Sequence, residues 1–188
     1  MKLLWINILS CFFFLTIGCA NEEKAETWVT YENEAFKYTV EMPTQPHMET
    51  KDMDAGAGEL LVEIAASFQE VEDAPNHSFM VSCMNFPKPI IKKSDTLGLK
   101  KLFKTIIEGL LIKFKGELLF EKDIDLAGLP VKEIRIEYLD EVSKLTKLVT
   151  YRILVKENLQ FLIQTSCVKG KDMEGSGDRF LSSFSFTE

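Results

Sequence analysis

The sequence predicts an α+β fold in which an antiparallel β-sheet is sandwiched by helices, with the element order ββββ-α-ββββ-α. Apolar residues alternate with a period of two both before and after residues 95–115. Residues 95–115 themselves follow the period of an amphipathic helix. A short apolar helix is expected close to the C-terminus. Because short turns connect the successive strands, we expect neighbouring strands to be antiparallel.

Four strands are expected before the long helix, and the alternation begins at Trp28. The stretch FKYTVEMP has four apolar residues on one face, namely Phe36, Tyr38, Val40 and Met42. Pro43 ends this strand, and the polar segment with two glycines that follows is expected to be a loop. The strand ELLVEIAASFQ alternates again, and HSFMVSCMNF is apolar on both faces, which is typical of a central strand.

The long helix is expected over residues 95–115, with Ser94, Asp95 or Thr96 as its N-cap. Its apolar arc holds Leu99, Leu102, Phe103, Ile106, Leu110 and Phe114. After Gly116 the period of two returns, and two hairpins are expected, ELLFEKDIDL with VKEIRIEY and TKLVTYRILVK with LQFLIQTSC. The stretch RFLSSF is expected to form the short second helix.

The N-terminal segment differs from the rest of the chain. Lys2 precedes an apolar run, residues 3–17, that is shorter than the roughly 20 residues a helix needs to cross a bilayer. A run of this kind that ends in a small residue is typical of a secretory signal peptide. Here the small residue, Gly18, is followed by Cys19 and then by polar and acidic residues. We therefore expect residues 1–18 to be a signal peptide.

The stretch LTIGC, which ends at Cys19, resembles the lipobox of bacterial lipoproteins, although Thr16 stands where that family favours leucine. The resemblance implies cleavage between Gly18 and Cys19, acylation of Cys19 by lipids such as palmitate, and a stable membrane anchor. Ala20, in place of aspartate, implies the outer membrane, with the protein facing the periplasm or the cell surface. A signal peptide without lipid and an uncleaved anchor remain the alternatives.

After cleavage, residues 19–27 would consist of the lipidated cysteine and a tether, of which residues 20–27 span at most roughly 26 Å. Residues 28–188 are enough for a single well-buried domain. The whole chain has 22 basic and 29 acidic side chains and a formal net charge of −7. This charge argues against a nucleic-acid partner, because nucleic-acid binding needs a basic surface.

The pattern and order of residues 28–188 resemble those of exported PsbP-like α/β/α sandwich domains. The resemblance is carried by FKYTVEMPTQP, FMVSCMNFP, the long helix, DIDLAGLPVKEIRIEY, the long hairpin and RFLSSFSF. That family includes an extrinsic oxygen-evolving subunit of photosystem II and many small bacterial lipoproteins. The resemblance implies a binding or assembly module, and no family active site can be transferred to this chain.

The residues themselves predict no catalytic centre, no metal site and no cofactor. The two histidines, His47 and His77, fall in loop-like segments outside any recognisable motif. On one strand, His77 and Cys83 would be roughly 20 Å apart, which is too far for a nucleophile and its base. An uncharacterised hydrolase is therefore the least favoured function.

Two side-chain groups are the remaining candidates. Lysines around the long helix form either a solvated face or a contact surface for acidic lipid headgroups or an acidic partner, with Lys100, Lys101, Lys104 and Lys115 as its candidate residues. Two cysteines of the exported domain, Cys83 and Cys167, could form a disulfide if their strands are neighbours; two buried thiols are the alternative.

We therefore expect a lipid-anchored, non-catalytic module that binds a protein of the cell envelope. The alternative is a carrier of an apolar ligand such as a lipid. The carrier predicts an unfilled apolar cavity lined by inward residues such as Phe120, Tyr138 and Tyr151. The binding module instead predicts a filled core and an exposed apolar or charged patch.

Overall fold

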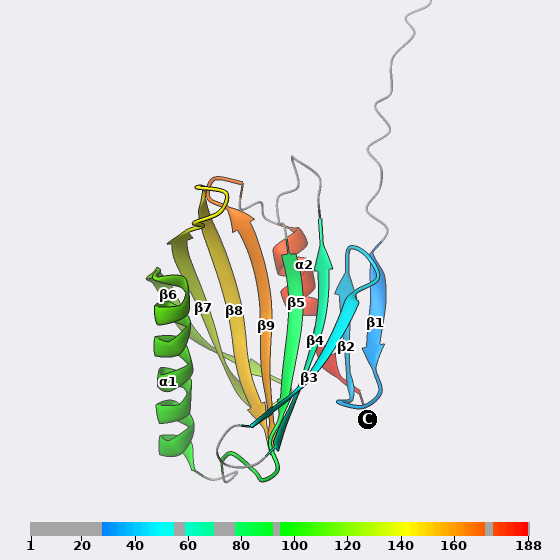
Figure 1. Ribbon diagram of the computed structural model, residues 1–188. Helices are drawn as coiled ribbons and strands as arrows, with labels where there is room; N and C mark the ends of the chain where they lie inside the picture. Colours follow the sequence, from blue (N-terminus) through cyan, green and yellow to red (C-terminus); the bar gives the residue numbers. More distant parts are fainter. Residues whose placement is uncertain (1–27, 55–58, 70–77, 92–94, 172–174, 188) are drawn as a thin grey trace, which may run out of the picture.

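A seven-stranded antiparallel sheet forms the centre of the protein (Figure 1). The computed structural model describes residues 28–54, 59–69, 78–91, 95–171 and 175–187. The strand order is β3-β4-β5-β9-β8-β7-β6, so that β3 and β6 are the edge strands. The strands are β3 (His47–Asp54), β4 (Glu59–Phe68), β5 (Ser78–Asn85), β6 (Glu117–Leu126), β7 (Leu129–Leu139), β8 (Thr146–Lys156) and β9 (Leu159–Val168).

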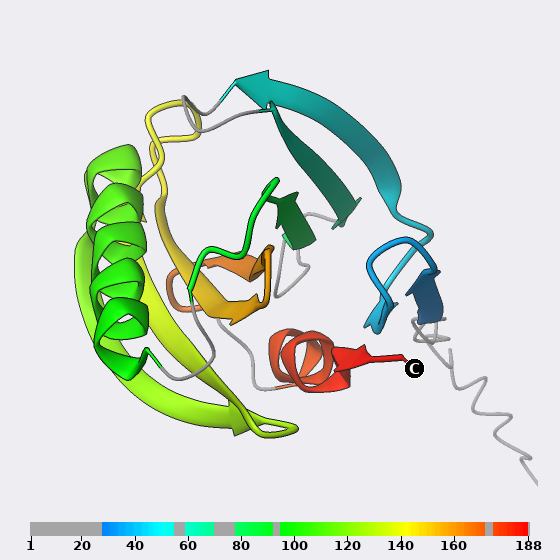
Figure 2. The ribbon, with the colours of Figure 1, turned by 90° about the horizontal axis from the view of Figure 1, so that it is seen from below.

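A smaller sheet and two helices cover this central sheet. The smaller sheet has the order β1-β2-β10 and consists of β1 (Val29–Asn33), β2 (Tyr38–Met42) and β10 (Ser185–Phe186). Helix α1 (Thr96–Phe114) packs on one face of the central sheet, and helix α2 (Ser176–Ser183) packs with the smaller sheet on the other (Figures 1 and 2). The predicted α+β architecture of antiparallel sheet with two helices is thus confirmed.

Two separate cores form because alternate residues of each strand point to opposite faces. On the α2 face, Tyr38 stacks on Phe184 with ring centroids 5.3 Å apart and meets Phe161 edge-on at 5.8 Å. On the α1 face, buried residues of the helix pack on buried residues of β7 and β8, namely Phe103, Ile107, Leu110, Ile134, Ile136, Val149, Tyr151 and Ile153. Alternate residues of β8 point to the other face, where Leu154 belongs to the α2-face core.

Local sequence determines both ends of α1. The Asp95 carboxylate accepts a hydrogen bond from the Gly98 backbone N–H at 2.8 Å, as an N-cap does. The helix ends where Lys115 adopts a left-handed backbone conformation, with φ of 49°. The next residue must be glycine, because a Cβ on Gly116 would lie 2.6 Å from the carbonyl oxygen of Glu137. The corner between α1 and β6 therefore lies directly against β7.

The predicted element order is only roughly right. Five strands precede α1 instead of four, because residues 47–54, predicted as a loop, form the edge strand β3. Residues 47–52 of this edge strand are all exposed, and a strand exposed on both faces needs no apolar alternation, so the sequence has no strand-like pattern there. The two-residue strand β10 was also not predicted, and α2 begins at Ser176, three residues before the predicted segment.

Of the two alternatives for Cys83 and Cys167, a disulfide and two buried thiols, the structure has the second. Strands β5 and β9 are indeed neighbours, but Cys83 lies opposite Phe161, six residues along β9 from Cys167. That offset is about 20 Å along a strand, whereas a disulfide needs Cα atoms within about 7 Å. Burial, with a smaller contribution from Glu63, raises the pKa of the Cys83 thiol well above its usual value. The thiol of Cys83 is therefore protonated and unreactive.

Residues 1–27 lie outside the described residues, and with them the predicted cleavage site at Gly18, the predicted lipid attachment at Cys19 and the tether. In the part of the chain that the structure describes, no helix is long and apolar enough to cross a bilayer.

Candidate binding groove beside helix α1

A groove of about 700 Å³ runs between α1 and strands β6 and β7. Its apolar lining comes mainly from the helix, with Leu99, Phe103, Ile107 and Leu111 from α1 and Leu118 from β6. Its charged residues come from both sides, with Lys100, Lys104 and Glu108 on α1, Glu121 and Asp123 on β6, and Lys132 on β7. The groove thus has an apolar floor between two charged rims.

A β-bulge explains why the groove has an acidic rim. The register between β6 and β7 shifts between Leu118 and Phe120, so that Leu118 pairs with Ile136 but Glu121 pairs with Ile134. The extra residue reverses the alternation, and Glu121 rather than Phe120 lies on the α1 side of the sheet. After the bulge, the side chains of β6 on the α1 side are the charged Glu121 and Asp123. Apolar side chains at these places would have packed against the helix. We infer that the groove exists because of this reversal.

Ion pairs hold the sheet side of the groove in place. Lys132, whose side chain is only 16 % exposed, lies 2.5 Å from a carboxylate oxygen of Glu121 and 3.0 Å from one of Asp123. The hydrogen bond to Glu121 raises the pKa of Lys132 despite its partial burial, so the ammonium stays charged. Two carboxylates around one ammonium leave this rim net negative.

The helix side of the groove is net positive. Lys104 and Glu108 lie 3.8 Å apart, but both are well exposed, so that their attraction is weak. In the described part of the chain, Lys100 is in no ion pair. The groove therefore has rims of opposite sign on its two sides.

The four lysines that were predicted to form one contact surface lie in different places in the structure. Lys100 and Lys104 line the groove, whereas Lys101 is not part of its lining. Lys115 lies at the C-terminal end of α1, where its ammonium is 2.7 Å from Glu141. The sequence reasoning missed the opposite rim, although the charged run EKDID contained the signal.

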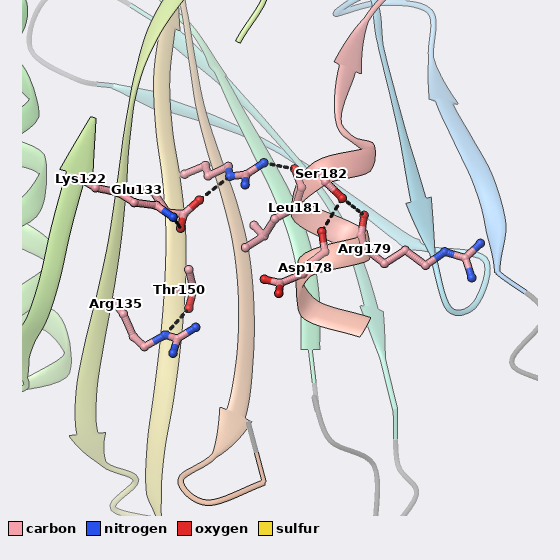
Figure 3. A network of polar contacts seen from close by, with 9 residues as sticks. Lys122, Glu133, Arg135, Thr150, Asp178, Arg179, Leu181 and Ser182 are labelled. Atoms are coloured by element: carbon pink, nitrogen blue, oxygen red, sulfur yellow. Dashed lines mark hydrogen bonds and ion pairs between the residues drawn. The ribbon is translucent and has the colours of Figure 1, made fainter. Parts of the chain in front are cut away.

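The opposite face of the same strands carries a buried polar network (Figure 3). Glu133, which is 5 % exposed, accepts hydrogen bonds at 2.7 Å from Arg152 Nε and forms an ion pair at 2.7 Å with Lys122. Arg152 also donates from Nη1 to the carbonyl oxygen of Leu181 in α2. Burial alone would raise the pKa of Glu133, but the hydrogen bonds from Lys122 and Arg152 outweigh it and lower the pKa. This network attaches α2 to the sheet.

The three aromatic residues on which the carrier prediction depended are all packed. The Tyr151 side chain is 1 % exposed, and its hydroxyl donates to Gln164 Oε1 at 2.5 Å. Tyr138 packs against Phe114 with ring centroids 4.6 Å apart. Phe120 lies under the Arg135 guanidinium, which is 5.3 Å from the centre of its ring. None of the three is left to line an unfilled cavity.

The described residues also locate one of the two histidines. His47 is exposed at the start of β3, and His77 lies outside the described residues. Within the described ranges, no group of three or more His, Cys, Asp and Glu side chains is placed to hold a metal ion.

The central antiparallel sheet with a helix on each face is a PsbP-like fold, as the sequence resemblance implied. The structure is similar to the solution structure of cyanobacterial PsbP (CyanoP) from Synechocystis sp. PCC 6803, with a TM-score of 0.52 and 13 % sequence identity. The similarity covers 90 % of this chain and 98 % of CyanoP. At this identity the likeness concerns the fold alone.

Two other solved structures are less similar. A protein from Bacteroides thetaiotaomicron has a TM-score of 0.46 at 10 % identity over 85 % of this chain, which spans about half, 48 %, of that protein. The protein of unknown function PA94 from Pseudomonas aeruginosa has a TM-score of 0.38 at 9 % identity, over 77 % of this chain and 85 % of PA94. No protein-family model and no curated protein sequence matches the chain.

Proposed function

We propose that the protein is a lipid-anchored lipoprotein of the cell envelope and acts as a non-catalytic binding or assembly module. The proposed binding site for its protein partner is the groove between α1 and strands β6 and β7. The observation that carries the proposal is this open groove, with its apolar floor and two rims of opposite charge. The PsbP-like fold supports the proposal because the sequence resemblance to PsbP-like domains implies a binding or assembly module.

The chemistry of the groove favours a particular kind of partner segment. Apolar side chains of the partner would cover Leu99 and Phe103, its acidic side chains would face Lys100 and Lys104, and its basic side chains would face Glu121. Complementary charges of this kind determine the orientation of a bound segment more than they add affinity. We therefore expect an amphipathic segment with both signs of charge, held in one direction along α1.

The groove can be tested with two lysines of the same helix. A photo-crosslinking residue at position 104 should capture the partner in membranes of the native cells, and the same residue at position 101 should not. Lys104→Glu should lower recovery of the partner severalfold, whereas Lys101→Glu should change it little. Equal crosslinking at both positions would show that the groove is not the binding site.

A carrier of an apolar ligand is the alternative, because a volume of about 700 Å³ is within the range of small-molecule sites. The packing of Tyr151, Tyr138 and Phe120 argues against a closed lipid cavity at those residues. Mass spectrometry of lipids that remain bound to the purified protein separates the two functions. A stoichiometric lipid that Phe103→Trp displaces would support the carrier.

The membrane anchor needs its own test, since it depends on the lipobox resemblance alone. In cells fed labelled palmitate, the wild-type protein should carry the label and Cys19→Ala should not. A Cys83→Ala variant is the matched control and should label like wild type, because its buried thiol is unreactive. Labelling of the Cys19→Ala variant would contradict the predicted anchor.

A further inference from the structure

The described chain begins at one end of the molecule, which we call the entry end. Strand β1 begins there, in the upper part of Figure 1, and the ring of Trp28, the residue before β1, lies 4.5 Å from the Arg179 guanidinium of α2. The same end holds the last turn of α1, the β7–β8 loop and the end of β9 (Figure 1). We define the entry end by residue 28 and residues 112–117, 137–147 and 168–171.

Apolar side chains are unusually exposed at the entry end. Val142 is 95 % exposed at the tip of the β7–β8 loop, and Ile112 is 78 % exposed in the last turn of α1. Leu139 and Leu145 flank the loop and are also exposed. Isolated exposed apolar residues are common, but here four of them lie at one end of the molecule.

The loop cannot fold back to bury Val142, because hydrogen bonds hold its backbone. The Asp140 carboxylate accepts from the backbone N–H groups of Val142 at 3.0 Å and Ser143 at 2.8 Å. Lys147 donates to the same carboxylate at 2.7 Å, and this bond together with the backbone bonds holds the pKa of Asp140 well below its usual range. The neighbouring ion pair between Glu141 and Lys115 joins the loop to α1.

The entry end is basic although the protein is acidic. Its described residues include six lysines, Lys113, Lys115, Lys144, Lys147, Lys169 and Lys171. They include four carboxylates, of which Glu137, Asp140 and Glu141 are in ion pairs with lysines. In the part of the chain that the structure describes, neither Lys113 nor Lys144 is in an ion pair. These two ammonium groups therefore remain to attract an anionic surface.

We propose that the entry end docks on an anionic lipid bilayer, with Val142 and Leu145 among the headgroups and Lys113 and Lys144 at the lipid phosphates. The inference rests on the membrane location in the proposed function. Exposed aliphatic residues with lysines nearby suit an anionic interface, where the aliphatic side chains enter the headgroup region and the ammonium groups attract lipid phosphates. A tether of residues 20–27, at most roughly 26 Å long, would keep this end close to the membrane.

Tryptophan fluorescence can test this docking. The full chain is reconstituted into vesicles of phosphatidylcholine with about 30 % phosphatidylglycerol, in which the acyl chains are brominated to quench nearby tryptophan. Val142→Trp should be quenched more than twofold relative to the parent protein. Leu97→Trp is the matched control, because Leu97 is 64 % exposed at the opposite end of α1, and it should show no added quenching.

Charge variants and flotation complete the experiment. In the Val142→Trp background, Lys113→Glu with Lys144→Glu should abolish the added quenching, whereas Lys88→Glu, in the loop before α1, should not. Co-flotation with the vesicles reports membrane attachment separately. Flotation without added quenching at position 142 overturns the docking alone, and failure to float overturns the membrane location together with the docking. Equal quenching in pure phosphatidylcholine overturns the role of the lysines.

Discussion

The two faces of the central sheet differ in how completely they are covered. Helix α2 and three short strands close one face, where Tyr38, Phe161 and Phe184 are each at most 2 % exposed. Helix α1 alone covers part of the other face, and a groove remains beside it. The same strands make both faces, but the bulge in β6 reverses the alternation of its side chains beside the groove. The difference shows that this sheet is closed on one face, whereas a groove stays open beside the core of the other.

The largest expected effect is on the closed face. Phe161→Ala removes a ring that contacts Tyr38, Phe184 and Phe186, so the free energy of unfolding should fall by about 3–5 kcal/mol. Urea denaturation measures this fall in the free energy of unfolding. Phe103→Ala on α1 is the matched variant, and it should cost at least about 1 kcal/mol less, because water can enter the space beside the groove. Equal losses would contradict the proposed difference between the faces.

A smaller effect is expected at the polar network that attaches α2. Glu133→Gln leaves Arg152 without its charged partner and should lower the free energy of unfolding at neutral pH by about 2–3 kcal/mol. The pKa of Glu133 is lowered in the folded protein, so its stabilising effect is complete above the ordinary glutamate pKa of about 4.3. That effect is lost as the pH falls through the lower folded pKa.

The pH dependence of the stability difference tests whether the charge of Glu133 causes it. The stability difference between wild type and Glu133→Gln should persist at pH 7 and shrink as the pH is lowered below about 4. A difference that stays constant down to pH 2 would show that the lost interaction does not depend on charge. Glu121→Gln, on the exposed rim of the groove, should cost less than about 1 kcal/mol at any pH.

The smallest effects on stability are expected at the surfaces proposed for binding. Lys104→Glu in the groove and Val142→Ser at the entry end should each change the free energy of unfolding by less than about 0.5 kcal/mol. Their effects should instead appear in partner recovery and in membrane docking. A loss above about 1 kcal/mol in urea denaturation would show that these residues serve the fold rather than binding.

The elements with strong periodicity could be predicted from the sequence. Helix α1 is predicted at 95–115 and observed at Thr96–Phe114. The prediction is accurate because the apolar arc and the N-cap residue Asp95 indicate the same helix. The inward face of β2 was also predicted correctly, since Tyr38, Val40 and Met42 are all buried. In β4 the predicted inward face, Leu60 to Phe68 in alternation, was partly wrong: Ala65 of the alternate face belongs to the α2-face core, and Phe68 is 59 % exposed.

One of the two charged rims of the candidate groove could be predicted from the sequence. Lys100 and Lys104 were recognised because they lie on a helix whose periodicity is clear. The acidic rim was not, because it depends on the bulge in β6, which is a property of two paired strands rather than of one segment. For the same reason the separation of Cys83 and Cys167 needed the register between β5 and β9.

The closing of the α2-face core has a consequence for the order of folding. The hydroxyls of Thr39 and Ser185 are 2.9 Å apart although the two residues are 146 positions apart in the chain. Phe184 and Phe186, among the last five residues, complete the ring cluster around Tyr38 and Phe161. A chain synthesised from its N-terminus therefore cannot complete this core until residues 184–186 are available, and contacts between residues so far apart in the chain form slowly.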